Sequence, residues 1–237
     1  MKTLNIMLLV IVLISCKKVN KQEVKDENYK QNIGVTESIN DCPIDSMKMK
    51  ISEFNGINFY SENTMRGKGV INISVDTKIE ILNLDKTIYG SISPSKNDLI
   101  PYDIHLPKNV VAREIIPDIE FRIFDFDAEQ PDNASEFVII YVNKEKKLLR
   151  KKNLQYTFSN WDKYIKSAFI QLDSDIINIS KEEQKYWYKA IQINADSMLI
   201  KSVSKTDCDY IEDYKDISKW IKWKNGNCKL IKLNFCY

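Results

Sequence analysis

The acidic segment 125–136 holds the residues whose types and spacing could do chemistry. It places oxygen-bearing side chains at offsets 1, 3, 5, 9 and 12, the spacing that calcium-binding loops use. The sixth position of such a loop needs glycine for its sharp turn, but here it is Gln130, and we expect strands rather than helices on either side. Asp125 and Asp127 could also act as a general acid and base. We interpret the segment as a solvated loop that turns at residues 131–133, and we predict neither a metal ligand nor a catalytic residue in it.

His105 is the only histidine of the chain. A single histidine excludes metal sites built from several, and it makes any Ser-His-Asp or Cys-His arrangement depend on this one residue. His105 stands between Ile104 and Leu106 without a recognisable catalytic constellation, so we expect a structural or exposed side chain. A hydrolase that uses Asp125, Asp127 or His105 remains a remote alternative, and no cofactor is expected.

The composition is that of a folded protein with balanced charge. Of 237 residues, 43% are hydrophobic, 11% aromatic and 29% charged, which excludes a wholly disordered chain, a collagen-like repeat and a polytopic membrane protein. Lys and Arg number 35 against 33 Asp and Glu, so the net charge of +2 provides no basic field for nucleic acid. Nucleic acid is therefore not an expected partner.

The first residues have the layout of a signal peptide. Lys2 provides a cation, and the apolar run at 6–14 follows it. A membrane-spanning helix needs about 20 apolar residues, so this run is too short to span a bilayer. The residues at the end of this run and just beyond it, LISC at 13–16, resemble the lipobox of bacterial lipoproteins. We therefore predict a lipoprotein signal peptide over residues 1–15.

The lipobox resemblance implies that the Cys16 sulfur carries acyl chains such as palmitate and that the chain is cut just before this residue. Several acyl chains anchor a protein durably to a membrane without spanning it. The residue after the cysteine is Lys17 rather than the aspartate that retains some lipoproteins in the inner membrane. The resemblance thus implies a cell-envelope protein at the outer membrane, and it leaves open which side of that membrane the body faces.

Residues 16–40 are predicted to be the lipidated cysteine followed by a flexible tether. The stretch at 17–32 reads KKVNKQEVKDENYKQN and has too few apolar residues to order itself. A soft chain from residue 17 to about residue 40 spans roughly 25–30 Å. A partly formed helix over residues 21–30 is the alternative.

The body from residue 54 onward has the period-two alternation of β-strands. The run FVIIYV at 137–142 suits a strand buried on both faces. The alternating apolar positions are Ile71, Ile73, Val75, Ile79, Ile81, Ile119, Phe121, Ile123, Leu154, Tyr156 and Phe158. The pattern predicts a mainly β fold.

A short helix is predicted where Asn160 can cap its start. Trp161, Tyr164, Ile165 and Ala168 then fall on one helical face. The chain should accordingly consist of two small antiparallel β-barrel or sheet units joined by this helix. We place an N-terminal β-rich domain at residues 41–160 and a C-terminal domain at residues 161–237.

The C-terminal domain contains the clearest hairpin signal. Residues 217–224 and 227–235 flank Asn225-Gly226, a pair that tolerates the positive φ angles of a tight turn. This register sets Trp223 opposite Cys228 and Trp220 opposite Ile231. Upstream, residues 186–194 and 198–203 are predicted to form another strand pair.

The phrases YWYKAIQINADSMLIKS and KWIKWKNGNCKL, and the order of these strands, resemble bacterial Src-homology-3-like domains of envelope proteins. The resemblance covers about residues 167–237, with a long insert at 204–216 that departs from the compact form. Residues 114–158 show the same order of strands, so a second barrel of this type is an alternative for this region. The resemblance implies a ligand groove lined by aromatic residues, for which the candidates are Tyr186, Tyr188, Trp220 and Trp223. Core and cross-strand packing is the alternative role of these side chains.

With Cys16 assigned to lipid, four cysteines can form disulfides in an oxidising compartment. In one extended strand Cys228 and Cys236 would lie about 26 Å apart, too far to bond. Cys228 must then pair with Cys208 or Cys42, and we favour Cys208, with Cys42 near Cys236. Four reduced thiols are the alternative, and none has the spacing of a zinc site.

The run KEKKLLRKKN at 144–153 is the one concentrated basic segment. It could attract an anionic polymer or an acidic protein face, or it could be a solvated hairpin tip. The whole pattern predicts a lipid-anchored envelope protein that is not an enzyme and that binds a cell-wall peptide, such as peptidoglycan provides, or another envelope protein. An inhibitor or immunity lipoprotein that blocks a lytic enzyme or toxin is the alternative.

Overall fold

The computed structural model describes Cys42 and residues 49–97, 99–206 and 214–237. By its internal contacts the chain divides into residues 1–38 and 39–237, and only the second unit contains described residues. The predicted signal peptide, the tether and the lipidation and disulfide candidates Cys16 and Cys208 lie outside the described part. The predicted domain boundary at residue 160 stays a prediction.

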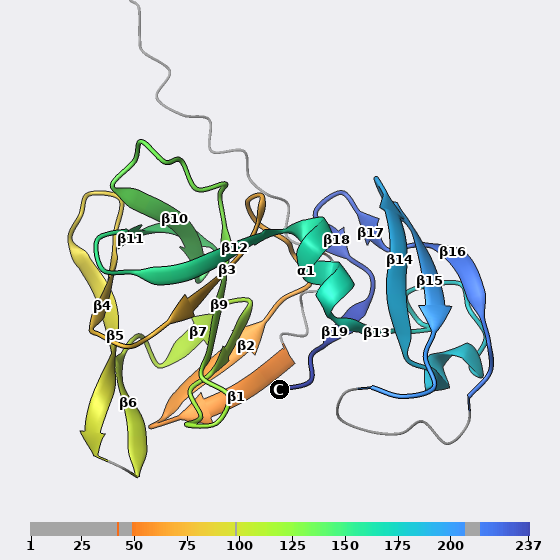
Figure 1. Cartoon of the computed structure of the whole chain (residues 1–237), viewed down its shortest axis with the longest axis horizontal. Coiled ribbons are helices and arrows are strands. Elements are labelled where there is room, and N and C mark those ends of the chain that lie inside the picture. The colour runs from red at the N-terminus through yellow and green to blue at the C-terminus, as the bar shows by residue number, and fades with distance from the viewer. Residues whose placement is uncertain (1–41, 43–48, 98, 207–213) are drawn as a thin grey trace, which may run out of the picture. The chain divides into compact units, whose positions relative to one another are not determined.

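Strands make up most of the described chain, so the predicted mainly β fold class is confirmed (Figure 1). A three-stranded sheet has the order β1-β2-β7. Its strands are β1 (Met49–Phe54), β2 (Ile57–Ser61) and β7 (Asn109–Val111). The described part contains one α-helix, α1 (Trp161–Ser167), and a 3-10 turn at Glu183–Lys185.

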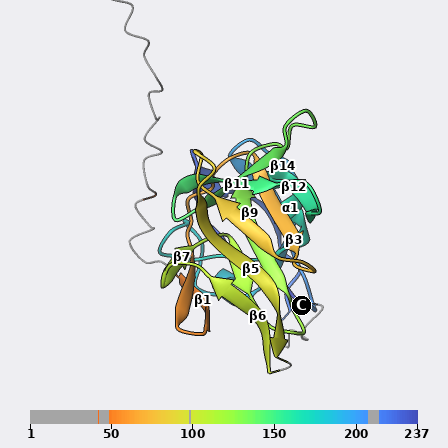
Figure 2. The same cartoon turned by 90° about the vertical axis from the view of Figure 1, so that its left-hand side faces the viewer.

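A nine-stranded sheet forms the larger share of residues 69–160. Its order is β12-β3-β9-β10-β11-β4-β5-β6, with β8 paired to β9. The strands are β3 (Gly69–Ser74), β4 (Ile79–Leu82), β5 (Ile88–Asn97), β6 (Ile100–His105), β8 (Glu114–Ile116), β9 (Ile123–Ala128), β10 (Phe137–Val142), β11 (Glu145–Arg150) and β12 (Gln155–Asn160). Figure 2 turns the molecule so that the β5–β6 hairpin faces the viewer.

A five-stranded sheet follows α1 and has the order β16-β15-β14-β13-β19. Its strands are β13 (Phe169–Gln171), β14 (Tyr188–Asn194), β15 (Ser197–Ser202), β16 (Ser218–Lys222) and β19 (Lys232–Asn234). Two strands of two residues each, β17 (Lys224–Asn225) and β18 (Cys228–Lys229), pair with each other and lie between β16 and β19 in sequence. None of the described sheets closes into a barrel.

The predicted alternation is confirmed where it is strongest. In β3, Ile71 and Ile73 are buried, whereas Asn72 and Ser74 are exposed. The alternation fails at Ile119 and Phe121, which are exposed in a turn before β9 instead of lying in a strand.

Asp118 explains that turn. Its side chain accepts a hydrogen bond from the Glu120 backbone at 2.7 Å, and its carbonyl oxygen accepts one from the Arg122 backbone at 2.9 Å. Aspartate stabilises turns in this way, and here the turn overrides the strand pattern.

The predicted helix is confirmed with its cap. Asn160 Oδ1 accepts a hydrogen bond from the Lys163 backbone at 2.9 Å, which satisfies one of the unpaired donors at the helix start. Tyr164 and Ile165 are buried on the expected face. Ile165 belongs to the second of two hydrophobic clusters, which gathers residues of the five-stranded sheet, while the first cluster lies within residues 57–149.

The predicted C-terminal hairpin is wrong in its pairing. β16 pairs with β15 and β19 pairs with β13, so the two arms lie at opposite edges of the five-stranded sheet. Trp220 lies opposite Leu199 rather than Ile231. Separate pairing of the arms buries both Ile221 and Ile231 in the second cluster, and this burial outweighs the local turn signal.

Only the β17–β18 tip retains the hairpin. Asn225 lies opposite Cys228, so the turn is Gly226-Asn227, with Gly226 at φ +58°. The upstream pair β14–β15 is confirmed, with Asn194 opposite Ser197.

Residues 114–158 do not form a second barrel. β11 pairs with β4 and β12 pairs with β3, so these strands complete the same sheet as residues 69–105. The echo in sequence reflects alternation alone, which any half-buried strand shows.

A disulfide joins Cys42 to Cys228, whose Cα atoms are 5.1 Å apart, so of the two partners left open for Cys228 the structure contains Cys42. The favoured Cys208–Cys228 pairing and its companion Cys42–Cys236 are therefore wrong; Cys236 is itself disulfide-bonded. The β17–β18 tip docks on the segment at 63–65, where Met65 N donates to Asn227 O at 2.8 Å. Cys42 N donates to Thr64 Oγ1 at 3.1 Å, so the same segment brings the two cysteines together.

Candidate functional site

The four aromatic residues predicted to line a groove do not share a surface. Tyr186 and Tyr188 are buried in the second cluster, as is Trp223, which is 2% exposed. The Trp223 indole donates to Ala195 O at 3.0 Å, so its polar atom is also satisfied inside the fold. Trp220 alone is accessible, with 49% of its surface exposed.

Trp220 belongs to the outer face of strands β14–β16. The strand register aligns Trp220 with Leu199 and Leu199 with Gln192 across the three strands. Ile191, in the irregularity between Ala190 and Gln192, is 53% exposed. We call the set Ile191, Leu199 and Trp220 the Trp220 face; it places accessible apolar side chains on an otherwise polar sheet surface.

A shallow hollow of about 350 Å³ adjoins the Trp220 face. Ile191 and Tyr214 contribute apolar surface to it, and Lys189, Lys201 and Lys205 contribute positive charge. Hollows of this size fall at the small end of ligand sites. Aromatic and aliphatic surface beside ammonium groups suits a peptide that carries both apolar side chains and carboxylates.

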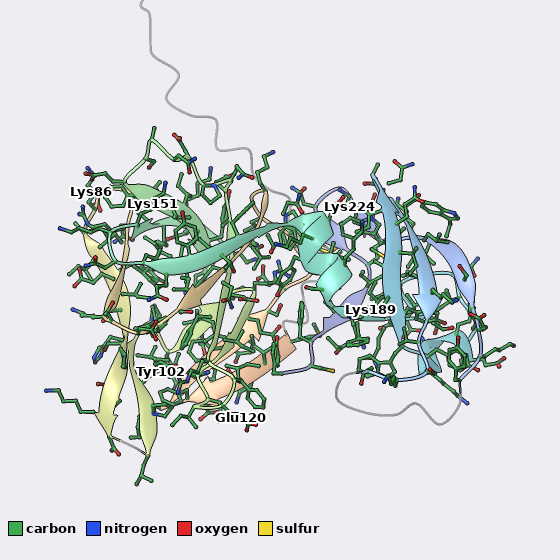
Figure 3. All side chains as sticks on the ribbon, in the orientation of Figure 1. Lys86, Tyr102, Glu120, Lys151, Lys189 and Lys224 are labelled. Atoms are coloured by element: carbon green, nitrogen blue, oxygen red, sulfur yellow. A yellow bond between two sulfur atoms is a disulfide. The ribbon has the colours of Figure 1, made fainter. Side chains whose placement is uncertain are left out.

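Two of these lysines also make contacts within the protein. Lys189 Nζ donates to Ser167 O at 2.8 Å and lies 3.6 Å from the centre of the Phe169 ring (Figure 3 labels Lys189). Lys201 forms an exposed ion pair with Asp216 at 3.7 Å. Exposed pairs of this kind contribute little to stability, so Lys201 can exchange Asp216 for a ligand carboxylate at small cost.

A buried ionic network joins β9 to the segment before β3. The Arg113 guanidinium donates to both carboxylate oxygens of Asp127, at 2.7 and 2.8 Å, and also to the carbonyl oxygens of Glu62 and Thr64. Arg66 Nη2 pairs with Glu62 Oε2 at 2.8 Å. Every charge here has an opposite charge beside it, so the network serves the fold. Sequence reasoning missed it because Glu62 and Arg113 are 51 residues apart.

Asp125 and Glu114 form a second buried acidic group. They lie opposite each other in the β8–β9 register. Asn72 Nδ2 donates to Asp125 Oδ1 at 2.7 Å and the Tyr164 hydroxyl donates to Oδ2 at 3.1 Å. Burial raises the pKa of Asp125 to about 6. Burial, and then the charge of Asp125, raises the pKa of Glu114 to about 7.

The C-terminal aromatic residues pack beside this acidic pair. The Phe235 ring lies 5.0 Å from the Tyr164 ring and 6.0 Å from the Tyr237 ring. The Tyr237 side chain is hydrogen-bonded to Glu114, and burial raises the pKa of Tyr237. The pair can therefore hold a proton near neutral pH, and its hydrogen bonds to Asn72, Tyr164 and Tyr237 are made within the fold.

The remote catalytic candidates are not brought together. Asp125 and Asp127 are buried in β9 with the partners given above, whereas His105 is exposed at the end of β6. Strands β6 and β9 are separated by four others in the sheet order. Within the described ranges, no group of three or more His, Cys, Asp and Glu side chains could hold a metal ion.

The predicted basic run is divided between two environments. Lys147 is buried, donates to Asn83 Oδ1 at 2.9 Å and lies 4.1 Å from the centre of the Tyr89 ring. Arg150 and Lys152 are exposed and line a groove on the nine-stranded sheet. The run is therefore largely a paired strand, β11, with exposed cations at both ends and Lys147 buried between them.

No protein-family model, no curated protein and no solved structure matches this chain. In the part of the chain that the structure describes, no helix is long and apolar enough to cross a membrane.

Proposed function

We propose that this chain is a lipid-anchored cell-envelope protein that binds a ligand without catalysing a reaction. The anchor is Cys16, as the lipobox resemblance implies, and residues 17–40 are a tether that holds the body close to the membrane surface. The ligand is a cell-wall peptide, and the Trp220 face with its adjoining hollow is the surface that binds it.

The exposure of Trp220 is the observation that carries this proposal. An indole that is half accessible exposes a large apolar surface to water, and such residues are frequent among those that dominate binding energy. Leu199 and Ile191 extend the apolar surface on the same side of the sheet. Polar neighbours surround it, an arrangement typical of recognition surfaces.

The strand arrangement supports the resemblance to a Src-homology-3-like domain. β13, the first strand after α1, pairs with both β14 and β19, so the first and last strands of this region are adjacent. Adjacent first and last strands are a feature of small barrels, although here β16 and β19 remain the edges of an open sheet among the described strands. A domain of this type would account for a peptide ligand.

The chemistry of the hollow favours a peptide with free carboxylates. Lys201 and Lys205 provide ammonium groups at its edge, while Tyr214 and Ile191 provide apolar contact. A wholly apolar ligand would make no use of the positive charge at the edge of the hollow, and a simple anion would make no use of the aromatic surface.

Sedimentation with purified peptidoglycan tests the proposal. The body from residue 33 onward, which includes the whole compact unit at 39–237, is mixed with insoluble peptidoglycan and with solubilised envelope. We expect wild-type protein to sediment with peptidoglycan and Trp220→Ala to remain in solution. Leu99→Ala is the matched control, because Leu99 is 90% exposed in the turn between β5 and β6, away from the five-stranded sheet, and its loss should change nothing.

Circular dichroism of each variant establishes that it is folded. Absence of wild-type sedimentation would overturn the wall-peptide proposal. Capture of a single envelope protein in its place, with nanomolar affinity, would establish the inhibitor or immunity function instead.

A further inference from the structure

A second groove lies on the nine-stranded sheet, where the pairing of β4 is incomplete. β11 pairs with Ile81 and Leu82 only, while the first half of β4 has a strand partner on the β5 side alone among the described strands. After Arg150 the chain turns away through residues 151–154 and enters β12, which pairs with β3. The divergence leaves a groove of about 520 Å³.

The groove has an apolar floor. Ile79 and Leu82 are buried beneath it, and Leu154 is partly buried beside them. Ile88, which also lines the groove, is 64% exposed. An accessible aliphatic side chain at the edge of a groove offers contact to the apolar part of a ligand.

The walls of the groove are cationic. Lys78, Lys86, Arg150 and Lys152 line it, against a single carboxylate, Glu80. Lys78 pairs with Glu80 at 2.9 Å, so one positive charge is offset locally. Three cations remain to create a positive potential over the apolar floor, and a concave surface concentrates that potential.

One aromatic ring holds two of these cations near each other. Lys86 Nζ lies 5.5 Å and Arg150 Cζ 5.0 Å from the centre of the Phe137 ring (Figure 3 labels Lys86). Among the described residues, the carboxylate paired with Arg150 is that of Glu136, at 3.6 Å in an exposed geometry that contributes little. The guanidinium can therefore bind an anion while it remains stacked on the ring.

We propose that this groove binds a phosphate-bearing amphiphile. Its phosphate groups contact Arg150, Lys86 and Lys152, and its apolar portion lies against Ile88. Arginine and lysine together suit phosphate, because the guanidinium provides a planar pair of donors and the ammonium a mobile point charge. This site is independent of the Trp220 face, which lies on another sheet. The amphiphile is a phospholipid of a bilayer; a soluble phosphate compound shares the headgroup chemistry and is the contrary outcome of the test.

Vesicle binding separates these two outcomes. The body from residue 33 onward is sedimented with vesicles of phosphatidylcholine containing 30% phosphatidylglycerol, and with pure phosphatidylcholine vesicles. Inorganic pyrophosphate serves as the soluble competitor. We expect binding to the anionic vesicles only, with partial competition by pyrophosphate, and a loss of affinity of about tenfold in Lys86→Gln/Arg150→Gln.

The matched control is Lys163→Gln/Lys166→Gln, which removes the same charge from exposed positions of α1. Its vesicle affinity should stay within about twofold of wild type if the groove is a site. Ile88→Ser should weaken vesicle binding and leave pyrophosphate binding unchanged. Equal losses of vesicle affinity in the two double variants would show non-specific attraction and would overturn the proposal. A protein that binds pyrophosphate but does not bind the anionic vesicles would also overturn it, because the ligand would then not be an amphiphile.

Trp220→Ala should leave vesicle binding unchanged. The proposed wall-peptide site and the proposed phosphate site can therefore fail separately.

Discussion

At the scale of single residues, the buried charges separate structural from binding roles. Arg113 and Asp127 are both buried and paired in two hydrogen bonds, whereas Arg150 and Glu136 are exposed and 3.6 Å apart. When a buried charge loses its partner, no water can solvate the charge in the partner's place. An exposed charge that loses its partner is solvated by water. The first pair should therefore be essential to the fold and the second dispensable for it.

Arg113→Met should destabilise the protein by about 3–5 kcal/mol, because the Asp127 carboxylate would remain buried without its partner. Arg150→Met should change the free energy of unfolding by less than about 1 kcal/mol. Urea unfolding at pH 7 measures both values. Similar small effects in the two variants would contradict the structural role of the Arg113 network.

Glu114 should make stability depend on pH. Its pKa is about 7 in the folded state against 4.5 in the absence of these interactions, and the pKa of Asp125 beside it is also raised. The folded state thus binds protons more strongly than the unfolded chain, so this contribution is fully present below the unfolded pKa and is lost as pH rises through about 7. We expect Glu114 to lower the free energy of unfolding by on the order of 2 kcal/mol between about pH 5 and pH 8.

Glu114→Gln should remove most of that slope and raise stability at pH 8, because the amide stays neutral. Glu120→Gln, at an exposed position, is the control and should keep the wild-type slope. Urea unfolding at several pH values between about 5 and 8 gives the slopes. A Glu114→Gln profile parallel to that of wild type would show that another group carries the dependence.

At the scale of elements, the two C-terminal tryptophans have opposite environments although they are three residues apart. Trp223 is buried against the second cluster, and Trp220 faces solvent on β16. Trp223→Ala should cost about 3–5 kcal/mol of stability, because it creates a large cavity. Trp220→Ala should cost less than about 1 kcal/mol. Thermal and urea unfolding measure the stability of the two variants. Equal losses of stability would contradict a buried Trp223 and an exposed Trp220.

Sequence patterns predicted the elements better than their partners. The alternation at Ile71 and Ile73 and the Asn160 cap depend on neighbouring residues, and both are confirmed. The arms of the predicted hairpin pair instead with β15 and β13, because pairing depends on burial contributed by distant parts of the chain. A local turn signal such as Asn225-Gly226 contains no information on that choice.

The candidate site was predictable only in part for the same reason. Of the four aromatic residues, the sequence could not separate exposed Trp220 from buried Tyr188, since alternation assigns side chains to two faces of a strand without showing which face packs against the core. The groove lined by Arg150 and Lys86 joins residues 64 positions apart, and only the fold brings them together.

At the scale of the whole molecule, the proposed anchor and the two proposed sites describe a protein that works at a membrane surface. The anchor predicts that full-length protein expressed in a bacterial host incorporates labelled palmitate and fractionates with membranes. Cys16→Ser should abolish the label and release the protein from the membrane fraction, because no acyl chain can then attach. Labelling that persists in Cys16→Ser would contradict the assignment.

The most direct test of the proposed function is the affinity of the body for soluble peptidoglycan fragments, measured by isothermal titration calorimetry. Truncating a central aromatic residue of a binding surface typically costs 2 kcal/mol or more, so Trp220→Ala should raise the dissociation constant by at least about tenfold, while Leu99→Ala should leave it within about twofold. Equal affinities of wild type and Trp220→Ala, with both proteins folded, would contradict binding through the Trp220 face.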